Sequence, residues 1–524
     1  MNMEIKQKAI SSPQAGADSF RSHGWLLFII LAALTAFRLY YGTTIPLSED
    51  EALYWQWSRH LHWGYYDMGP MVGYVIRLGT ALLGNTELGV RAPAAILMLA
   101  TSILLYRFCV RIFKDPGLGF WLVIAANGTV FFTAGSVIHT YDIELIFFWM
   151  LSLYLAGLAI FDNRPHAWYW SGAAAGAAML SKYTAVMLPA CLFIFLVATP
   201  KHRFWLKRKE PWLGSILAAL IMVPNLYWNS THLWITFRHS MYMAGGRDWK
   251  FTLFEFLGGQ AGLLGPILFV LLVIGLVLAF RQAKQGDTRQ SFLLWTSVPI
   301  LSLFVIFSIG TRVYANWSAP GYPAAILAAG WALRDRVRPA GGWRKWAIAG
   351  IVMGYILVAV AHFHVPFIKA LDLEPDADPT MKIYGWPQLG QAVGEEMEKW
   401  TDANRPFVFG LRFQKASLAA FYTPGQPDAQ CLFLPGYRLN AYVFWTNPRT
   451  LAGRDGLAVV HGKPNLGALF ERFELVRELE LIGPTGKVIN WATLYRCYNF
   501  KGRDFRPEEF QAILDKGKNN PNDT

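Results

Sequence analysis

Carboxylates and aromatic rings are concentrated in one short stretch near the start of the chain. Residues 43–70 contain Glu49, Asp50 and Glu51, and Asp67 follows in a GYYD sequence. Such carboxylates can remove a proton from a hydroxyl, hold a divalent ion, or face water from an interfacial helix. The rings between them are suited to stacking on a sugar or an isoprenoid chain. They are Tyr54, Trp55, Trp57, Trp63, Tyr65 and Tyr66.

A second set of charged residues lies beside long apolar segments. Asp142 stands at one end of an apolar run, and the cations Lys182 and Arg312 each stand next to another run. Ionisable groups at membrane depth are costly and usually face a partner or a polar cavity. Asp142 would also suit a helix cap, and each cation would also suit a side chain that reaches toward lipid headgroups. Together, the two cations indicate a place for an anionic group such as a lipid phosphate.

The chemistry that fits these residues is sugar transfer from a polyprenyl-phosphate donor. A carboxylate removes the proton of an acceptor hydroxyl, the hydroxyl attacks the anomeric carbon, and a phosphate leaves. Because phosphate is already a good leaving group, it needs stabilisation by cations rather than an acid. We therefore expect the acids and the cations to converge on one membrane face.

The elements that must position these residues are membrane-spanning helices. Only 16% of the residues are charged, against about 25% in soluble domains, and the deficit falls in the first two thirds of the chain. Apolar runs there are long enough to cross a bilayer. The predicted spans are 24–42, 88–108, 117–137, 142–161, 167–181, 183–199, 211–229, 253–280, 291–310, 317–333 and 344–365. With the amphipathic stretch 69–84 and uncertain boundaries, the prediction is a mostly α polytopic fold of about 11–13 spans.

Basic loops orient these spans. Lys and Arg gather in 106–116, 200–210, 281–290 and 334–346, and cytoplasmic loops are enriched in these residues. Counting from a cytoplasmic N-terminus puts all of these loops on the cytoplasmic side of the inner membrane. The acids of the first loop then lie outside. The net charge of +13 therefore reflects membrane orientation and not a nucleic-acid partner.

The predicted domain organisation is a cytoplasmic tail at 1–23, a transmembrane catalytic domain at 24–365 with a first periplasmic loop at 43–70, and a periplasmic soluble domain at 366–524. Alternating apolar stretches and turn signals in the last domain indicate mixed α/β structure. It contains Cys431 and Cys497, and outside the cytoplasm these two thiols could form a disulfide.

Several segments together resemble a known family. They are EDEALYWQWSRHLHWGYYDMGP, SVIHTYDIELIFFW, GAAMLSKYTAVMLP, PNLYWNSTHLWITFRHS, RVYANWSAPGYPA, MKIYGWPQLG, KASLAAFYTPGQP and YRLNAYVFW. The chain resembles the family 39 glycosyltransferases of the GT-C fold, bacterial relatives of the protein O-mannosyltransferases. Within them it is similar to the aminoarabinose and galacturonosyl transferases that modify lipid A and lipopolysaccharide. The likeness extends from about Leu47 to Phe500.

The resemblance implies a role for each candidate residue. Asp50 matches the acid that is the usual candidate for the catalytic base, and Glu51 is its companion. Asp142 matches a second acid that helps to place donor or acceptor. Lys182 matches a basic residue near the lipid phosphate, and Arg312 is a looser match for a second phosphate contact. The expected substrate contacts are Asp67, Tyr54, Tyr66 and Trp57.

One departure from the family pattern concerns the residues after the GYYD segment. Many relatives have His-Pro-Pro or Lys-Pro-Pro there, whereas this chain has Met68-Gly69-Pro70. A phosphate contact at that position would need another cation, for which Arg77 and Arg91 are the candidates.

The predicted function is that of an integral membrane glycosyltransferase. It would move a monosaccharide from a polyprenyl-phosphate donor to a hydroxyl of lipid A or lipopolysaccharide on the periplasmic face. No cofactor is expected to be required, although an Asp-Glu pair could hold a divalent metal. The alternatives are a flippase or transporter of lipid-linked sugar, a protein O-glycosyltransferase, and a non-catalytic subunit of an envelope complex. A transporter would place its ionisable residues near mid-membrane and show repeat symmetry.

Overall fold

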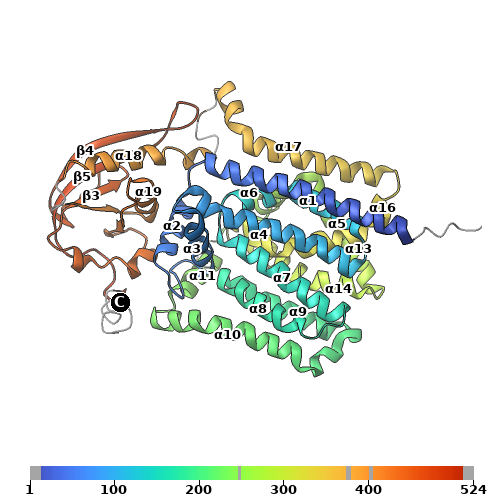
Figure 1. Ribbon diagram of the computed structural model, residues 1–524. Coiled ribbons are helices and arrows are strands. Elements are labelled where there is room, and N and C mark those ends of the chain that lie inside the picture. Colours follow the sequence, from blue (N-terminus) through green and yellow to red (C-terminus); the bar gives the residue numbers. More distant parts are fainter. Residues whose placement is uncertain (1–12, 246–248, 373, 375–378, 401–404, 511–524) are drawn as a thin grey trace, which may run out of the picture.

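Helices form the first two thirds of the molecule and a small sheet domain follows them (Figure 1). The computed structural model describes residues 13–245, 249–372, 374, 379–400 and 405–510. The bundle comprises α1 (Pro13–Thr44), α4 (Glu87–Phe108), α5 (Pro116–Asn127), α6 (Val130–Val137), α7 (Tyr141–Phe161), α8 (Ala167–Ser181), α9 (Met187–Ala198), α10 (Lys209–Thr231), α12 (Leu253–Leu264), α13 (Pro266–Lys284), α14 (Thr288–Trp295), α15 (Val298–Gly310), α16 (Tyr322–Val337) and α17 (Gly342–Ala370).

Seven of the described helices are long and apolar enough to cross a membrane, or up to nine if each of two bent helix pairs is one span. Three shorter helices gather at one end of the bundle, namely α2 (Glu49–Arg59), α3 (Met71–Leu83) and α11 (Ile235–Gly245). The stretch 69–84 is therefore a short apolar helix, α3, and not one of the seven.

Two predicted spans contain a marked break. The segment 253–280 divides at Gly265, which has a φ of +84°, and α13 starts afresh at Pro266. The segment 117–137 bends by 68° between α5 and α6. There Gly128 ends α5, and the Thr129 side chain caps α6 by accepting from the Phe132 N–H. Periodicity does not reveal such breaks, because apolar residues continue on both sides of them.

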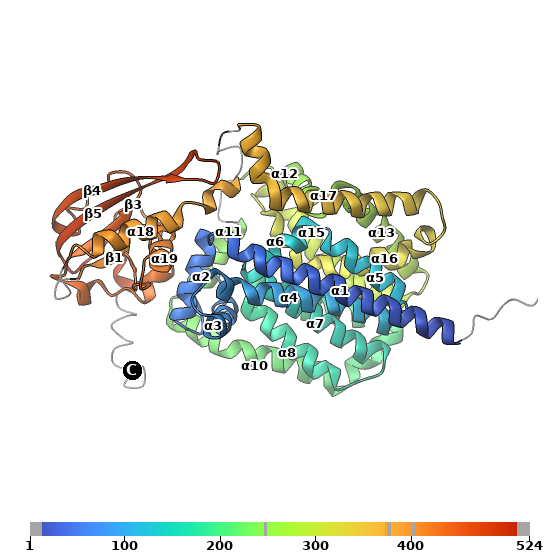
Figure 2. The same ribbon diagram turned by 45° about the horizontal axis from the view of Figure 1, so that its top comes forward.

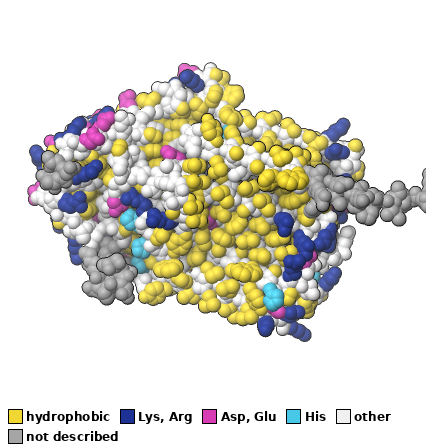
Figure 3. Space-filling model, viewed as in Figure 1, with side chains coloured by type: hydrophobic (Ala, Val, Ile, Leu, Met, Phe, Trp, Pro, Cys, Tyr) yellow, Lys and Arg dark blue, Asp and Glu magenta, His cyan; other side chains and the backbone are white. Residues whose placement is uncertain are grey.

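The two ends of the bundle differ in charge. The predicted basic loops join α4 to α5, α9 to α10, α13 to α14 and α16 to α17, and they lie at the end where α1 begins. Figure 3 shows Lys and Arg clustered there, a broad hydrophobic band across the middle, and mixed charges over the sheet domain. The acidic segment lies at the opposite end, beside that domain (Figure 2).

The C-terminal domain is a mixed sheet with two helices. Its strands are β1 (Phe407–Gly410), β2 (Gln430–Cys431), β3 (Gly456–Val460), β4 (Phe470–Ile482) and β5 (Val488–Phe500), in the order β2-β1-β3-β5-β4. β1 pairs in parallel with β2 and β3, and the other pairings are antiparallel. Cys431 and Cys497 are free buried thiols on β2 and β5, which β1 and β3 separate, so the structure does not join them in a disulfide.

One hydrophobic core crosses the boundary between the two domains. Leu47, Trp55 and Trp57 from the first loop pack in the same buried cluster as Leu389 of α18 (Trp386–Met397) and Phe421 of α19 (Phe413–Tyr422). The rings of Trp55 and Phe421 meet edge to face at 5.0 Å. The start of α2 is thereby held between the bundle and the C-terminal domain.

Candidate active site

The acidic segment forms the first turn of α2. Ser48 caps this helix by accepting from the Glu51 N–H, while the Glu51 carboxylate accepts from the Ser48 N–H. This reciprocal pair is a capping box. Carboxylates in the first turn are also stabilised by the helix dipole. The cap fixes which way each of the three consecutive acids points.

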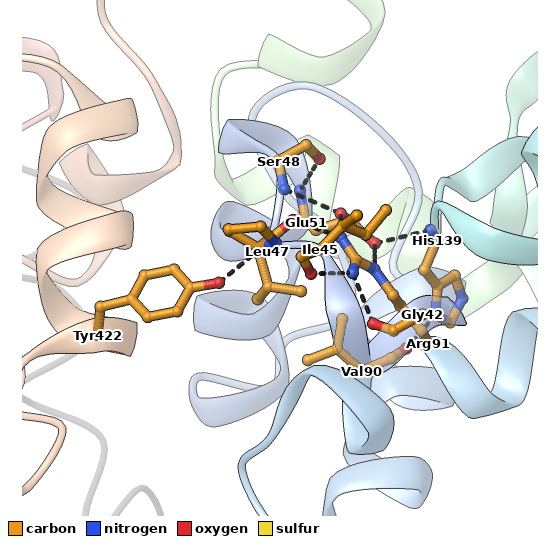
Figure 4. A network of polar contacts seen from close by, with 10 residues as sticks. Gly42, Ile45, Leu47, Ser48, Glu51, Val90, Arg91, His139 and Tyr422 are labelled. Carbon is orange, nitrogen blue, oxygen red and sulfur yellow. Dashed lines mark hydrogen bonds and ion pairs between the residues drawn. The ribbon is translucent and has the colours of Figure 1, made fainter. Parts of the chain in front are cut away.

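Glu51 is buried in a dense polar network (Figure 4). Both of its oxygens accept from Arg91 of α4 at 2.7 Å, and one also accepts from the His139 N–H at 3.0 Å. Burial opposes ionisation, but Arg91 and the two backbone N–H groups outweigh it and lower the pKa of Glu51. A carboxylate so fully engaged has no free oxygen for a substrate. The structure therefore gives Glu51 a structural place, and does not bring it to the reacting groups as the companion of Asp50.

Arg91 extends the same network to the chain that precedes α2. Its guanidinium donates to the carbonyl oxygens of Gly42, Ile45 and Pro46 at 2.7–2.8 Å. The ion pair thus joins the end of α1, the start of α2, α4 and the turn before α7. Arg91 is consequently occupied and cannot replace the cation missing at Met68. Arg77, the other candidate, is exposed on α3.

Asp50, one residue earlier, has a different environment. Its side chain is exposed, and within the described part of the chain it forms no hydrogen bond or ion pair. Protein nevertheless surrounds the carboxyl on most sides. This desolvation raises the pKa of Asp50, the neighbouring Glu51 raises it further, and Arg438 of the C-terminal domain offsets part of the increase. A reachable carboxylate with a raised pKa has the properties of a general base.

Asp142 and Lys182 form a buried ion pair. The Lys182 Nζ donates to Asp142 Oδ1 at 2.8 Å, and the Asn316 side-chain amide donates to Oδ2 at 2.6 Å. Lys182 follows the end of α8 and lies 5.0 Å above the ring of Tyr141. Sequence analysis singled out both charges but not their contact or Asn316. The acid neutralises the cation and fixes the position of its ammonium group.

Tyr54 connects the three acids electrostatically. Its ring is buried on α2 and meets Tyr141 edge to face at 5.9 Å. Burial raises the pKa of Tyr54 well above its usual value, and Asp50, Asp67 and Asp142 all add to the increase. Three acids that act on one phenol must lie near it. The structure thus brings together Asp50, Tyr54, Asp67, Asp142 and, through Asp142, Lys182.

Asp67 faces the C-terminal domain. Its Oδ1 accepts from Arg438 at 3.1 Å and lies 3.6 Å from the Nε2 of His239, on α11. Burial raises the pKa of Asp67 to about 6, opposed by Arg438 and reinforced by Asp50. Sequence analysis assigned no role to Arg438 or His239. The only signal for Arg438 was its place in the YRLNAYVFW segment.

Charges of the C-terminal domain also act on Glu49. Its pKa is raised by burial, while Lys415, Lys382 and Arg412 of the C-terminal domain oppose that increase. Lys415 is buried over the ring of Trp386 at 4.3 Å, and its ammonium has no hydrogen-bond partner among the described residues. Burial lowers the pKa of Lys415 to about 8. Cations of the C-terminal domain therefore face the acids of α2.

The remaining predicted residues differ in how they are placed. Tyr66 is partly exposed, with its ring 5.6 Å from that of His239. Trp57 is completely buried and stacks on Tyr65 at 4.2 Å, so its ring is not available to a substrate. Arg312 is exposed and pairs with Glu255 at 3.1 Å, and no described contact joins it to the Asp142–Lys182 pair. In the described part of the chain no three or more His, Cys, Asp or Glu side chains are grouped as metal ligands would be.

Comparison with known proteins supports the fold described above. The family model described as dolichyl-phosphate-mannose-protein mannosyltransferase matches residues 67–228. The computed structure is similar to crystal structures of ArnT from Cupriavidus metallidurans in the apo state (TM-score 0.64, 14% identity, 91% of this chain and 98% of that chain) and bound to undecaprenyl phosphate (0.61, 15%, 90% and 98%). The chain therefore has the GT-C fold of these structures and is similar in sequence to this glycosyltransferase family over part of its length. The predicted fold class, a polytopic GT-C bundle with a small sheet domain, is confirmed.

Two curated relatives are lipid-modifying glycosyltransferases by name. It is 28% identical to the lipid A galacturonosyltransferase RgtD of Rhizobium johnstonii, over 66% of this chain and 70% of that protein. It is also 28% identical to the undecaprenyl phosphate-alpha-4-amino-4-deoxy-L-arabinose arabinosyl transferase 1 of Pseudomonas fluorescens, over 65% of this chain and 66% of that protein.

Proposed function

We propose that this GT-C chain transfers a monosaccharide from an undecaprenyl-phosphate-linked donor to a hydroxyl of lipid A or of the attached lipopolysaccharide. The observation that carries the proposal is Asp50, a solvent-reachable carboxylate with a raised pKa and no partner among the described residues. The names of the relatives supply the substrate classes, since RgtD acts on lipid A and the arabinosyl transferase on an undecaprenyl-phosphate sugar.

In the proposed reaction, the Asp50 carboxylate removes the proton from the acceptor hydroxyl. The acceptor oxygen then forms a bond to the anomeric carbon, while the bond from that carbon to the phosphate oxygen breaks. The electron pair of the broken bond stays on the departing undecaprenyl phosphate. Its negative charge needs cations, and we assign this role first to Lys182, a buried cation held in place by Asp142. Tyr66, which is partly exposed, offers a ring for the sugar or the first isoprene units, whereas the ring of Tyr54 is buried beneath the site.

Arg438 is the second cation that we assign to the phosphate. It lies against Asp67, next to the position where the family pattern has a basic residue and this chain has Met68. A bidentate guanidinium suits phosphate. Because two protein cations then meet the leaving group, the proposal requires no metal ion.

The proposal also assigns a side of the membrane. The chain is a multi-span membrane protein with the GT-C fold, and we place α2 and the C-terminal domain in the periplasm because the basic loops lie at the other end. An alkaline phosphatase fused after α17 should be active, and one fused in the loop 334–346 should be inactive. The reverse pattern would exclude this orientation.

The decisive experiment is a transfer assay with purified chain in nanodiscs. It would be given undecaprenyl-phosphate-linked galacturonic acid or aminoarabinose with lipid A, and a membrane protein as a competing acceptor. Labelled sugar should move to lipid A, and Asp50→Asn should abolish transfer while the protein still folds. Transfer to the protein alone would favour the O-glycosyltransferase, and movement of donor across the bilayer without transfer would favour a flippase.

A further inference from the structure

A cavity of about 420 Å³ opens in the bundle far from the acidic site. Its lining residues belong mainly to α5, α13, α16 and α17, four helices that Figure 2 shows at the side of the bundle away from the sheet domain. Its walls are mostly apolar, with Trp121, Leu268 and Ile348 among them. The volume falls within the range of about 300–1,000 Å³ that ligand pockets occupy.

The path of α17 explains why the cavity is open. At Gly354 a Cβ would lie 2.3 Å from the Gly128 carbonyl oxygen, so α17 presses on the α5–α6 bend there. At Gly341 and Gly342, by contrast, no atom lies within 4 Å of where a Cβ would stand. Gly341 and Gly342 therefore border open space, and the groove lies between the first turns of α17 and the helices α5, α13 and α16.

Three arginines line this groove near the loop between α16 and α17. Arg334, Arg338 and Arg344 all line it. Arg338 pairs with Asp115, and Arg334 pairs with Asp335 at 3.2 Å while stacking on Trp331. Arg344 has no acidic partner among the described residues. The segment 334–345 reads RDRVRPAGGWRK and holds five cations and one acid, so even with Asp115 the mouth keeps a positive charge.

We propose that this groove is a binding site for one anionic phospholipid from the leaflet opposite the acidic site. An acyl chain lies along Leu268 and Ile348, and the headgroup phosphate meets Arg338 and Arg344. Apolar walls suit the chain, because it can pack against them by van der Waals contact as it packs against other lipid tails. The arginines add charge complementarity that a zwitterionic phospholipid satisfies less well. Neither the sugar-transfer chemistry nor the donor site is involved, so the two proposals stand or fall separately.

The test measures lipid selectivity of the full-length protein. Purified protein would be exchanged into phosphatidylcholine nanodiscs with and without phosphatidylglycerol, and retained lipids would be counted by native mass spectrometry. We expect one phosphatidylglycerol to be retained in preference to phosphatidylcholine. Each Arg→Gln change at Arg338 and Arg344 should reduce that preference about fivefold, from the free energy that one such cation contributes near an anionic surface.

Two further variants keep the test decisive. Ala347→Trp fills the groove and should remove the retained lipid whatever its headgroup. The double change Lys201→Gln with Arg203→Gln removes two positive charges, as many as Arg338→Gln and Arg344→Gln remove together. These charges lie in the loop after α9, outside the groove, so the lipid preference should be unchanged. The proposal fails if the loop variant lowers selectivity as much as the groove variants, or if Ala347→Trp retains the lipid. It also fails if added undecaprenyl phosphate displaces phosphatidylglycerol one for one, because the groove would then be a second polyprenyl site.

Discussion

Replacing Glu51 by Gln should destabilise the fold, whereas replacing its neighbour Asp50 by Asn should stop catalysis. Glu51 and Arg91 are 0% and 3% exposed, and both oxygens of the carboxylate bind the guanidinium. A glutamine keeps one acceptor oxygen but leaves Arg91 as an uncompensated buried charge. Breaking a buried pair in this way costs about 3–5 kcal/mol.

The measurement is the free energy of unfolding in mixed micelles, followed by tryptophan fluorescence, for the parent, Glu51→Gln and Asp50→Asn. The loss for Glu51→Gln should fall in the range above. Asp50 is exposed and forms no hydrogen bond within the described structure, so Asp50→Asn should change stability by less than about 0.5 kcal/mol. Both variants should transfer sugar poorly, the first because its site is displaced and the second because it lacks the base.

A double variant separates the pair from the rest of the network. Exchanging a buried ion pair for apolar residues is often neutral, but Arg91 also satisfies the carbonyls of Gly42, Ile45 and Pro46. Each buried carbonyl left without a donor costs about 1–3 kcal/mol, so Glu51→Leu with Arg91→Met should remain destabilised. If Glu51→Gln unfolds like the parent and only activity is lost, Glu51 takes part in the chemistry and the structural assignment is wrong.

Four further outcomes are expected. Because the pKa of Asp50 is raised, the initial transfer rate should increase with pH, and the midpoint of this increase should lie above the ordinary aspartate pKa of about 3.9. A rate that does not change down to pH 4 would contradict a base role. The pKa of Asp67 is about 6 in the folded state, so the folded state binds this proton more tightly than the unfolded state does. The free energy of unfolding, relative to that of Asp67→Asn, should therefore fall as pH rises from about 4 to 6. A difference that does not depend on pH in unfolding titrations would refute this. Arg438→Gln should raise the KM for donor about 10–100-fold, the loss of one charge-assisted hydrogen bond, whereas the exposed Arg449→Gln should have no effect on steady-state rates. A chelator in the transfer assay should leave the rate unchanged, and inhibition reversed by added metal would exclude the metal-free reaction.

The sequence was most informative about elements whose signal is local. Long apolar runs predicted the bundle, and each predicted segment lies in helical structure even where 253–280 and 117–137 break. The acids near residue 50 and the charges Asp142 and Lys182 were found because charge is rare in apolar surroundings. The breaks were missed because a turn at Gly265 or Thr129 needs only one or two residues and leaves the apolar pattern unchanged.

Contacts between distant segments were beyond the reach of the sequence. Nothing local indicates that Arg438 lies against Asp67, because 371 residues separate them. Likewise, the aromatic residues of the first loop gave no sign of which would be buried. Trp57 is covered by Tyr65 and packs against Gly73 of α3, whereas Tyr66 stays partly exposed. Tertiary packing therefore decided which of several equally plausible side chains a substrate can reach.

The contrast between Asp50 and Glu51 follows from the geometry of α2. Consecutive residues on a helix point about 100° apart. The Glu51 carboxylate therefore turns toward Arg91 in the bundle, while the Asp50 carboxylate turns toward solvent and the cations of the C-terminal domain. The buried pair fixes the start of α2, and this in turn fixes where Asp50 stands relative to Tyr54 and Asp142. Since Arg438 and Lys415 act on the same acids from the other side, the C-terminal domain is a part of the site. Removal of the C-terminal domain should therefore abolish transfer, even though the base Asp50 and the cation Lys182 both belong to the helical part of the chain.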